Sequence, residues 1–395
     1  MLDGGYAVKK VCFFTYNLFD LGGIQRVVTV LASALCSEYE VYIQCYDEPE
    51  KENRALYDLD SRVKVVFARR DNRKSVIRKA LRKLNQKYAV LEKLQNDALF
   101  EFAYILPEEQ RLYERIIVEN GIDIAIAVGA FESYILGSIA NKIQAKTIGW
   151  QHNSYKAYYE TPGMACWGMG YIIDKYFPKL DRYIVLNEYD QEEFLKKRNF
   201  ECLTIHNPKS FVSDKQAELK NKRFIAAGRF IYAKAFDLLI ESFQQFAKKN
   251  KDWELVIYGV GEDYEKIKTR IETLGLSDRV KLPGFSDRMT ENMMESSCYL
   301  LSSRWEGMPM VILEALEVGL PIISYDISAM IPLVDNGIEG IVVPQFDTGA
   351  FARAMLEIAG SEETRIRMGN AGRKKAEQFT VEKITERWFQ LLKEM

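Results

Sequence analysis

The sequence predicts an α/β protein built from two Rossmann-like domains. Short apolar runs alternate with amphipathic stretches along most of the chain, which favours parallel strands covered by helices. This alternation occurs in two successive series, and Asn207 and Pro208 break the chain between them. With 395 residues, the chain is long enough for two such domains, each with its own hydrophobic core.

Composition narrows the class of protein. The net charge is -2, so no overall field attracts nucleic acid, and any basic attraction must be local. Six cysteines lie scattered without C-x-x-C spacing, which is typical of reduced core thiols. The chain opens without a recognisable secretory signal, and no apolar run approaches bilayer-spanning length. We therefore expect a cytoplasmic protein, soluble or peripheral on the inner face of the cell membrane, with no nucleic-acid partner.

The first domain should begin with a buried strand at 10–16, followed by a turn and a helix at 24–36. The turn ends in Gly22 and Gly23, which would let the backbone approach a ligand closely and would present the helix N-terminus. On their own, the two glycines are better explained as a plain strand-to-helix turn. Further strands of this half are predicted at 40–46, 63–68, 122–128, 146–150 and 181–187.

A strongly basic segment interrupts this pattern. Residues 69–87 contain one acid, Asp71, and nine basic residues: Arg69, Arg70, Arg73, Lys74, Arg78, Lys79, Arg82, Lys83 and Lys87. Apolar residues recur at helical spacing through the same region, which predicts a basic amphipathic helix at 69–88 within a helical insertion of about 69–115. A solvated helix packed on its own domain is the simplest explanation. A surface for anionic lipid headgroups is the next, and nucleic acid is disfavoured by the overall charge.

The predicted strand at 146–150 leads directly to His152, one of only two histidines in the chain. Open α/β sheets bind ligands at the carboxyl ends of their strands, so we favour a functional role for His152 over that of a hydrogen-bonded structural histidine. The other histidine, His206, lies in the predicted linker, where a structural role is favoured. The following residues 154–170, rich in Tyr, Gly, Met and Trp, are expected to form a loop that either lines an acceptor pocket or covers the surface.

The second half opens with a predicted strand at 223–228, followed by Arg229 and then by Lys234 at the start of a helix. Gly228 permits a tight turn, and the guanidinium and ammonium groups together match a diphosphate. Either cation alone would more simply be solvated. A strand is also predicted at 253–258, and turn geometry alone can explain Gly259 and Gly261 after it.

The segment 302–326 reads as strand end, loop, helix and strand, with Pro309 at the expected first helical position and Gly319 closing the helix. The helix is apolar on almost every side yet carries Glu314 and Glu317, and a desolvated carboxylate needs a cation or a polar ligand. Glu306 lies eight positions before Glu314. A capping acid followed by a buried ion pair is one explanation, and a site for a phosphate or polar sugar is the other.

These motifs resemble those of family 4 retaining glycosyltransferases. The E-x7-E spacing within EGMP…LEAL..GLP resembles the family's donor-sugar signature, and GRF…AKAFDLLIESF resembles its G-R-x…K-G-x-D-x-L-I-x-A motif, with Ala235 in place of the usual Gly. The resemblance implies a GT-B fold of two facing Rossmann-like domains with an interdomain cleft. It divides the chain into an acceptor domain at 1–206, a nucleotide-sugar domain at 207–378, and a crossover helix at 379–395 that packs back on the first domain.

The resemblance also implies a role for each matching residue. Glu306 and His152 would contact the transferred sugar, and Arg229 and Lys234 would hold the diphosphate; these four form the expected catalytic group. The remaining donor-binding residues would be Gly22, Gly23, Gly228, Gly284, Phe285, Gly307, Met308, Pro309, Met310 and Glu314, with Glu314 on the nucleotide ribose and the 284–285 segment at the base.

The function that the resemblance implies is retaining transfer of a hexosyl group from a nucleotide sugar, most simply a UDP-sugar. The acceptor would be a saccharide, expected to be lipid-linked, in cell-surface polysaccharide synthesis. No cluster of histidines and carboxylates demands a metal, so we expect metal-independent turnover without a cofactor. Two alternatives are a nucleotide-sugar 2-epimerase of the same architecture and a non-catalytic adaptor that binds lipid through the basic helix.

Overall fold

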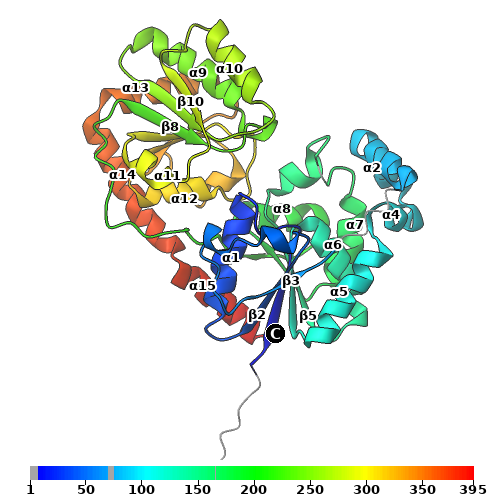
Figure 1. The fold of residues 1–395 in the computed structure, drawn as a ribbon. Helices are drawn as coiled ribbons and strands as arrows, with labels where there is room; N and C mark the ends of the chain where they lie inside the picture. The colour runs from blue at the N-terminus through cyan, green and yellow to red at the C-terminus, as the bar shows by residue number, and fades with distance from the viewer. Residues whose placement is uncertain (1–7, 70–74, 165) are drawn as a thin grey trace, which may run out of the picture. The chain divides into compact units, whose positions relative to one another are not determined.

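The computed structural model describes residues 8–69, 75–164 and 166–395. The chain divides into two compact units: unit 1 comprises Met1–Pro208 and Val381–Met395, and unit 2 comprises Lys209–Thr380. Each unit is a parallel sheet with helices on its faces (Figure 1), so the predicted architecture of two Rossmann-like domains is confirmed. The expected boundary after residue 206 lies two residues before this division.

The sheet of unit 1 has the strand order β3-β2-β1-β4-β5-β6-β7, parallel throughout. Strand β1, beside the central strand β4, is buried from Val11 to Phe14, with Phe13 paired to Ile43 on one side and to Ile126 of β4 on the other. The strands are β1 Lys10–Phe14, β2 Glu40–Cys45, β3 Lys64–Phe67, β4 Ile124–Val128, β5 Lys146–Trp150, β6 Arg182–Val185 and β7 Leu203–Thr204. Burial on both faces explains why these strands are near-continuous apolar runs in the sequence.

The helices of unit 1 are α1 Gly23–Leu35, α2 Val76–Tyr88, α3 Val90–Leu94, α4 Asp97–Tyr104, α5 Pro107–Asn120, α6 Ala130–Ile139, α7 Gly170–Tyr176, α8 Glu188–Arg198 and α15 Val381–Lys393. The expected basic helix is α2, but the helical pattern does not continue unbroken through Leu94. Ala89 adopts a left-handed conformation (φ 50°) that ends α2 and starts α3. The expected helical residues Arg70, Arg73 and Lys74 lie outside the described residues.

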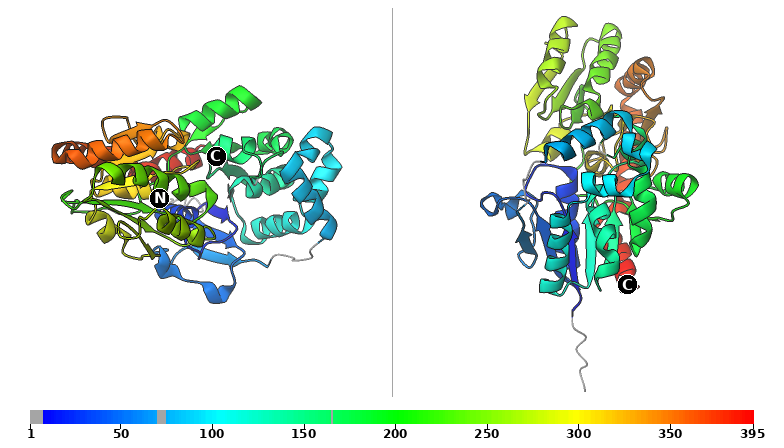
Figure 2. Two further views of the ribbon diagram at one scale, coloured as in Figure 1. Left: turned by 90° about the horizontal axis from the view of Figure 1, so that it is seen from above. Right: turned by 90° about the vertical axis from the view of Figure 1, so that its right-hand side faces the viewer.

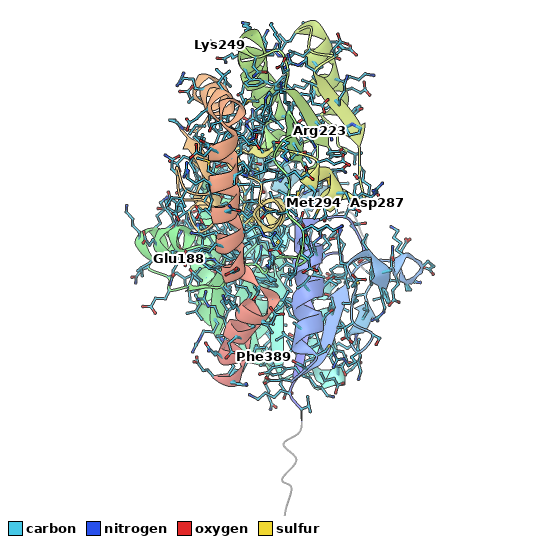
Figure 3. The ribbon with its side chains drawn as sticks, turned by 90° about the vertical axis from the view of Figure 1, so that its left-hand side faces the viewer. Glu188, Arg223, Lys249, Asp287, Met294 and Phe389 are labelled. Atoms are coloured by element: carbon cyan, nitrogen blue, oxygen red, sulfur yellow. The ribbon has the colours of Figure 1, made fainter. Side chains whose placement is uncertain are left out.

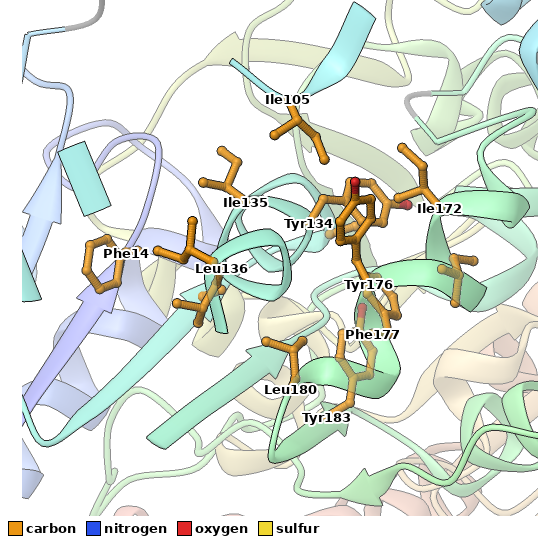
Figure 4. Packing of buried hydrophobic residues seen from close by; sticks show 14 of the residues in the cluster. Phe14, Ile105, Tyr134, Ile135, Leu136, Ile172, Tyr176, Phe177, Leu180 and Tyr183 are labelled. Atoms are coloured by element: carbon orange, nitrogen blue, oxygen red, sulfur yellow. The ribbon is translucent and has the colours of Figure 1, made fainter. Parts of the chain in front are cut away.

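The segment 154–170 is not simply a surface loop, because several of its large side chains are buried while its polar residues Lys156 and Glu160 are exposed. Tyr155 and Tyr159 are 1% and 6% exposed, and Cys166 is fully buried. A short π-helical turn, Lys156–Glu160, directs these side chains inward, so their spacing matches neither an α-helix nor a strand. They join an aromatic cluster in which Phe177 stacks on Tyr183 at 4.3 Å between ring centroids (Figure 4).

Helix α15 belongs to unit 1 although it is the last element of the chain. Trp388 lies edge-on to Trp150 of β5 at 5.0 Å, and Phe389 stacks on Tyr39 at 6.1 Å. Arg387 donates from Nη2 to the Thr204 carbonyl oxygen at 2.6 Å. The helix packs beside α1 (Figure 3), so the alternative that it is a core helix of the second domain is wrong.

The sheet of unit 2 has the strand order β10-β9-β8-β11-β12-β13, again parallel. Its strands are β8 Arg223–Ala227, β9 Glu254–Tyr258, β10 Val280–Gly284, β11 Cys298–Leu301, β12 Ile322–Tyr325 and β13 Gly340–Val343. Its helices are α9 Phe236–Lys249, α10 Tyr264–Thr273, α11 Met289–Met294, α12 Met310–Glu317, α13 Thr348–Gly360 and α14 Glu362–Ala376.

Both sheets reverse their strand order at a switch point, between β1 and β4 in unit 1 and between β8 and β11 in unit 2. The loops leaving the carboxyl ends of these strands run in opposite directions, which leaves a crevice where open α/β sheets bind ligands. Among the described residues, no helix combines the length and apolar character needed to cross a membrane.

Candidate active site

The candidate site of unit 2 lies at its switch point. The loop after β8 carries Gly228, Arg229 and Lys234, and the loop after the neighbouring strand β11 carries Glu306. The end of β10 contributes Gly284 at the same edge, because the carboxyl ends of parallel strands share one edge of a sheet. Residues that are far apart in the sequence are thereby collected at one place.

The centre of this site is an ion pair between Lys234 and Glu306. Lys234 Nζ donates to Glu306 Oε1 at 2.5 Å, and the Ser303 hydroxyl donates to the same oxygen at 2.6 Å. The two charged side chains are 19% and 15% exposed, so both can still contact a ligand. A partly desolvated pair of this kind holds each group in one orientation and makes its charge more effective than it would be in water.

Hydrogen bonds between the two loops hold this pair in place. The Ser302 hydroxyl donates to the Lys234 carbonyl oxygen at 2.8 Å, and the Arg304 amide donates to the Ala233 carbonyl oxygen at 2.7 Å. The Arg304 guanidinium also forms two bonds of 3.1 and 2.7 Å to the carboxylate of Asp237 in the first turn of α9. The sequence analysis missed the contact between Arg304 and Asp237. Arg304 lies within the segment 302–326, and Asp237 lies within the motif that follows Lys234.

Two glycines that turn geometry alone could explain are required by close backbone contacts. A Cβ on Gly259, where φ is 137°, would lie 1.9 Å from the Gly228 carbonyl oxygen. A Cβ on Gly261 would lie 2.5 Å from the Phe230 carbonyl oxygen. The backbone of the turn after β9 therefore packs directly against the backbone of the loop after β8. On Gly228 itself a Cβ would lie 3.1 Å from Lys234 Cε, so the lysine stem extends across this glycine.

Ala235 adopts the left-handed conformation (φ 51°, ψ 39°) that glycine adopts most readily. It is 1% exposed and precedes the first residue of α9. The substitution of Ala for the usual Gly therefore preserves the turn and leaves Lys234 in place, at a conformational cost of about 1 kcal/mol.

Helix α12 starts at Met310, so Pro309 is the capping residue before the helix rather than its first residue. Gly319 (φ 77°) follows its end, as predicted. The other expected donor-binding residues of this loop, Gly307, Met308 and Met310, are buried.

The two buried carboxylates of α12 contact the first residues of unit 2. Glu314 is 3% exposed and accepts a 2.8 Å hydrogen bond from the Ser210 hydroxyl. Glu317 pairs with Lys209 at 2.5 Å and accepts a 2.8 Å bond from the Ser213 amide. The sequence analysis left open a cation or a polar ligand as the partner of these carboxylates, and for Glu317 the partner is a cation, Lys209.

Arg229 and Phe285 are the exposed members of the expected site. Phe285 is 54% exposed and follows Gly284 (φ 88°) at the end of β10. The Gly284 carbonyl oxygen accepts the Gly259 amide at 2.8 Å, which joins this segment to the turn after β9. Both exposed side chains are available to a ligand at the carboxyl edge of the sheet.

In unit 1, the expected residues also follow carboxyl strand ends. Gly23 is the first residue of α1, and Gly22 before it donates its amide to the Tyr57 hydroxyl at 3.0 Å. His152 follows β5 and is 8% exposed, with its ring 4.2 Å from that of Trp150. Burial lowers the pKa of His152 to about 3, so its imidazole is neutral near pH 7.

The Nε2 atom of His152 is buried and has no hydrogen-bond partner among the described residues. A buried polar atom without a partner carries a free-energy cost, which a ligand hydroxyl would relieve. His206, by contrast, has its Nδ1 2.9 Å from the Leu186 carbonyl oxygen, in keeping with the structural role expected for it.

Within the described ranges, no group of three or more His, Cys, Asp or Glu side chains is arranged to hold a metal ion. The chain contains one Asp-x-Asp triplet, Asp58 to Asp60. Its second carboxylate pairs with Arg62 at 2.7 Å, and this contact lowers the pKa of Asp60 to about 2.

Comparison with known proteins agrees with this geometry. Residues 209–375 match the family model of glycosyl transferases group 1. An uncharacterized glycosyltransferase of Haemophilus influenzae is 26% identical over 390 residues, covering 96% of this chain and 99% of that protein. The poly(glycerol-phosphate) alpha-glucosyltransferase of Bacillus subtilis is 29% identical over 157 residues, covering 40% of this chain and 23% of that protein. Six further curated relatives likewise match over less than two thirds of their own length.

Among solved structures, S. aureus TarM in complex with Fondaparinux, alpha-GlcNAc-glycerol and UDP has a TM-score of 0.77. It is 16% identical in sequence, and the match covers 97% of this chain and 99% of that one. The expected fold of two Rossmann-like domains is therefore shared over nearly the whole of both chains. The chain has the GT-B fold, and residues 209–375, which make up most of unit 2, match the glycosyl transferases group 1 family.

Proposed function

We propose that this chain is a retaining hexosyltransferase of family 4 that moves a sugar from a nucleotide donor, a UDP-sugar, to a saccharide acceptor carried on a lipid. Synthesis of a bacterial surface polysaccharide is the process that it would serve, with the reaction at the cytoplasmic face of the cell membrane. The observation that carries the proposal is the Lys234–Glu306 pair, held by both loops at the switch point of unit 2.

The relatives support the class of donor and acceptor. The TarM structure contains UDP together with alpha-GlcNAc-glycerol, and the Bacillus subtilis relative is named for alpha-glucosyl transfer to a glycerol-phosphate polymer. Both names describe α-linked products, which is the outcome expected when an α-linked nucleotide sugar reacts with retention.

Unit 2 would bind the donor. Arg229 and Lys234 would hold the diphosphate, Glu314 the ribose hydroxyls, and the 284–285 segment the base. As the bond between the anomeric carbon and the phosphate oxygen breaks, negative charge grows on the departing diphosphate. Preorganised donors placed at such a charge are worth about 3 to 4 kcal/mol each in transition-state stabilisation.

Glu306 would orient the sugar instead of forming a covalent bond to it. Its carboxylate is already engaged by Lys234 and Ser303, and these two contacts hold it in one orientation. The acceptor hydroxyl would then attack on the face that the diphosphate leaves, with a phosphate oxygen taking its proton. We propose that the cations of the β8–α9 loop stabilise the negative charge on the departing diphosphate, and that turnover needs no metal or cofactor.

Unit 1 would supply the acceptor side. Gly22 and Gly23 would let ligand oxygens approach the amino end of α1. His152, neutral and with an unpartnered Nε2, would hydrogen-bond a hydroxyl of the transferred sugar.

Nucleotide release from a panel of UDP-, GDP- and ADP-sugars, with and without lipid-linked acceptors, tests the proposal when products are identified by mass spectrometry. Glu306→Ala and Lys234→Ala should abolish turnover. Lys222→Ala, which removes an exposed ion pair to Asp252 elsewhere in unit 2, should leave it unchanged.

Each of the other possible results would indicate a different activity or mechanism. Conversion of the donor to its epimer without any acceptor would make the chain a 2-epimerase. Silence with every donor would favour the non-catalytic adaptor. Turnover that a chelator abolishes and added metal restores would contradict the metal-independent mechanism.

A further inference from the structure

Helix α2 exposes an apolar stripe beside a row of lysines. Its large apolar side chains Val76, Ile77, Leu84 and Tyr88 are 79%, 67%, 46% and 51% exposed. Lys79, Lys83 and Lys87 are exposed as well and recur at intervals of four residues, which places them in one row along the helix. We call these seven side chains the α2 face.

The α2 face is held rigidly by the opposite side of the helix. Asn85 is fully buried; its Nδ2 donates to the Tyr104 hydroxyl at 3.1 Å and to the Gly168 carbonyl oxygen at 3.2 Å. Its Oδ1 accepts the Leu91 amide at 2.8 Å. These bonds anchor α2 to α3, α4 and the 163–168 segment, and α2 and α4 lie side by side at the edge of unit 1 (Figure 2).

No carboxylate in the described part of the chain neutralises the charges of the α2 face. The sequence of α2 contains no Asp or Glu. No carboxylate of a described residue lies within ion-pair distance of Lys79, Lys83 or Lys87. Like charges four residues apart on a helix repel one another, so the row of lysines destabilises the helix in the free protein. An anionic partner offsets that cost.

We propose that the α2 face docks on a membrane surface rich in anionic phospholipids. The apolar stripe would enter the headgroup boundary while the lysines contact lipid phosphates, a combination typical of interfacial helices. The phosphates of a nucleic acid would pair with the lysines, but a nucleic acid offers no nonpolar phase for the exposed aliphatic side chains. Exposed apolar residues on the neighbouring helices, Leu94, Leu99 and Phe102, extend the apolar surface of this region.

The position of α2 in unit 1 connects docking to the acceptor. Asn85 and Gln86 bond to the carbonyl oxygens of Gly168 and Gly163, in the segment that leads away from His152. This inference rests on the proposed function, because a lipid-linked acceptor is what requires the enzyme to sit on a bilayer. The membrane then presents the acceptor beside the unit that would bind it.

The test is co-sedimentation with vesicles of phosphatidylcholine alone and of phosphatidylcholine with one third phosphatidylglycerol. The parent protein should bind only the anionic vesicles, and high salt should weaken binding. Each lysine near such a surface contributes about 1 kcal/mol, or roughly fivefold in affinity. The triple variant Lys79→Gln, Lys83→Gln, Lys87→Gln should therefore bind about a hundredfold more weakly.

A matched control removes three exposed lysines from unit 2: Lys248→Gln, Lys249→Gln, Lys251→Gln (Lys249 is labelled in Figure 3). It makes the same change in net charge and should bind as the parent does. Replacing Val76, Ile77 and Leu84 with serine should weaken binding even at low salt, because the apolar contribution is lost. Thermal melting should confirm that all variants are folded.

Equal binding by the two triple-lysine variants would overturn the proposal, and so would tighter binding to duplex DNA than to anionic vesicles at equal phosphate. Sugar transfer to a short soluble acceptor separates this inference from the proposed function. Retained transfer without vesicle binding would refute docking alone, whereas vesicle binding without any transfer would refute the proposed chemistry alone.

Discussion

The buried ion pair between Lys209 and Glu317 offers a sharp test of the structure. Both side chains are only 6% exposed, and their charged atoms are 2.5 Å apart. Replacing Lys209 with methionine keeps most of the buried volume but leaves the Glu317 carboxylate desolvated without its cation. Breaking a buried pair in this way costs about 3 to 5 kcal/mol in unfolding free energy, which for a unit of this size corresponds to a fall in melting temperature of roughly 10 °C.

Urea unfolding of four proteins measures this: the parent, Lys209→Met, Glu317→Gln, and the double variant. Each single variant strands one buried charge and should lose several kcal/mol. The double variant strands none, and its glutamine oxygen can still accept the 2.8 Å bond from the Ser213 amide, so it should recover most of the loss.

Lys222→Met serves as the exposed control, because Lys222 and its partner Asp252 are 57% and 65% exposed. An exposed pair contributes at most about 1 kcal/mol. If Lys209→Met were no more destabilising than Lys222→Met, or if the double variant were as unstable as the sum of the singles, the burial and coupling described for this pair would be wrong.

Three further predictions concern single residues. Ala235→Gly should raise the unfolding free energy by about 1 kcal/mol in urea denaturation, because glycine relieves the left-handed strain; an unchanged value would contradict it. Gly259→Ala should lower the melting temperature markedly, since its Cβ would lie 1.9 Å from the Gly228 carbonyl oxygen, and a silent substitution would refute that contact. The pKa of His152 is lowered to about 3, so the unfolded chain takes up the proton first and stability falls as pH drops below about 6.5, by up to about 1.4 kcal/mol per pH unit. His152→Gln should remove that slope between pH 6 and 5, and a variant with the parent's slope would contradict it.

Much of the fold could be predicted because each element is specified locally. A strand buried on both faces is a continuous apolar run, and β5 matches its predicted range of 146–150. The candidate site could be located for a related reason: the carboxyl ends of parallel strands meet at one edge, so residues that follow predicted strands gather there. Lys234 and Glu306 were expected near the same ligand, and in the structure Lys234 Nζ lies 2.5 Å from Glu306 Oε1.

The features that the sequence analysis missed depend on contacts between distant residues. Lys209 and Glu317 are separated by 108 positions, and nothing near Lys209 in the sequence shows that it will be buried. Within the segment 154–170, which is otherwise mostly turns, the π-helical turn at Lys156–Glu160 was missed because it follows neither helical nor strand spacing. The break at Ala89 was missed because alanine ordinarily favours the interior of a helix.

The place of α15 in unit 1 has a consequence for how the protein is made. Domains generally fold in the order in which they leave the ribosome. Here Trp150, in the sheet of unit 1, meets its partner Trp388 only after the whole of unit 2 has been synthesised. Unit 2, which is continuous from Lys209 to Thr380, is complete earlier. Unit 1 must therefore wait with part of its core uncovered until α15 has left the ribosome.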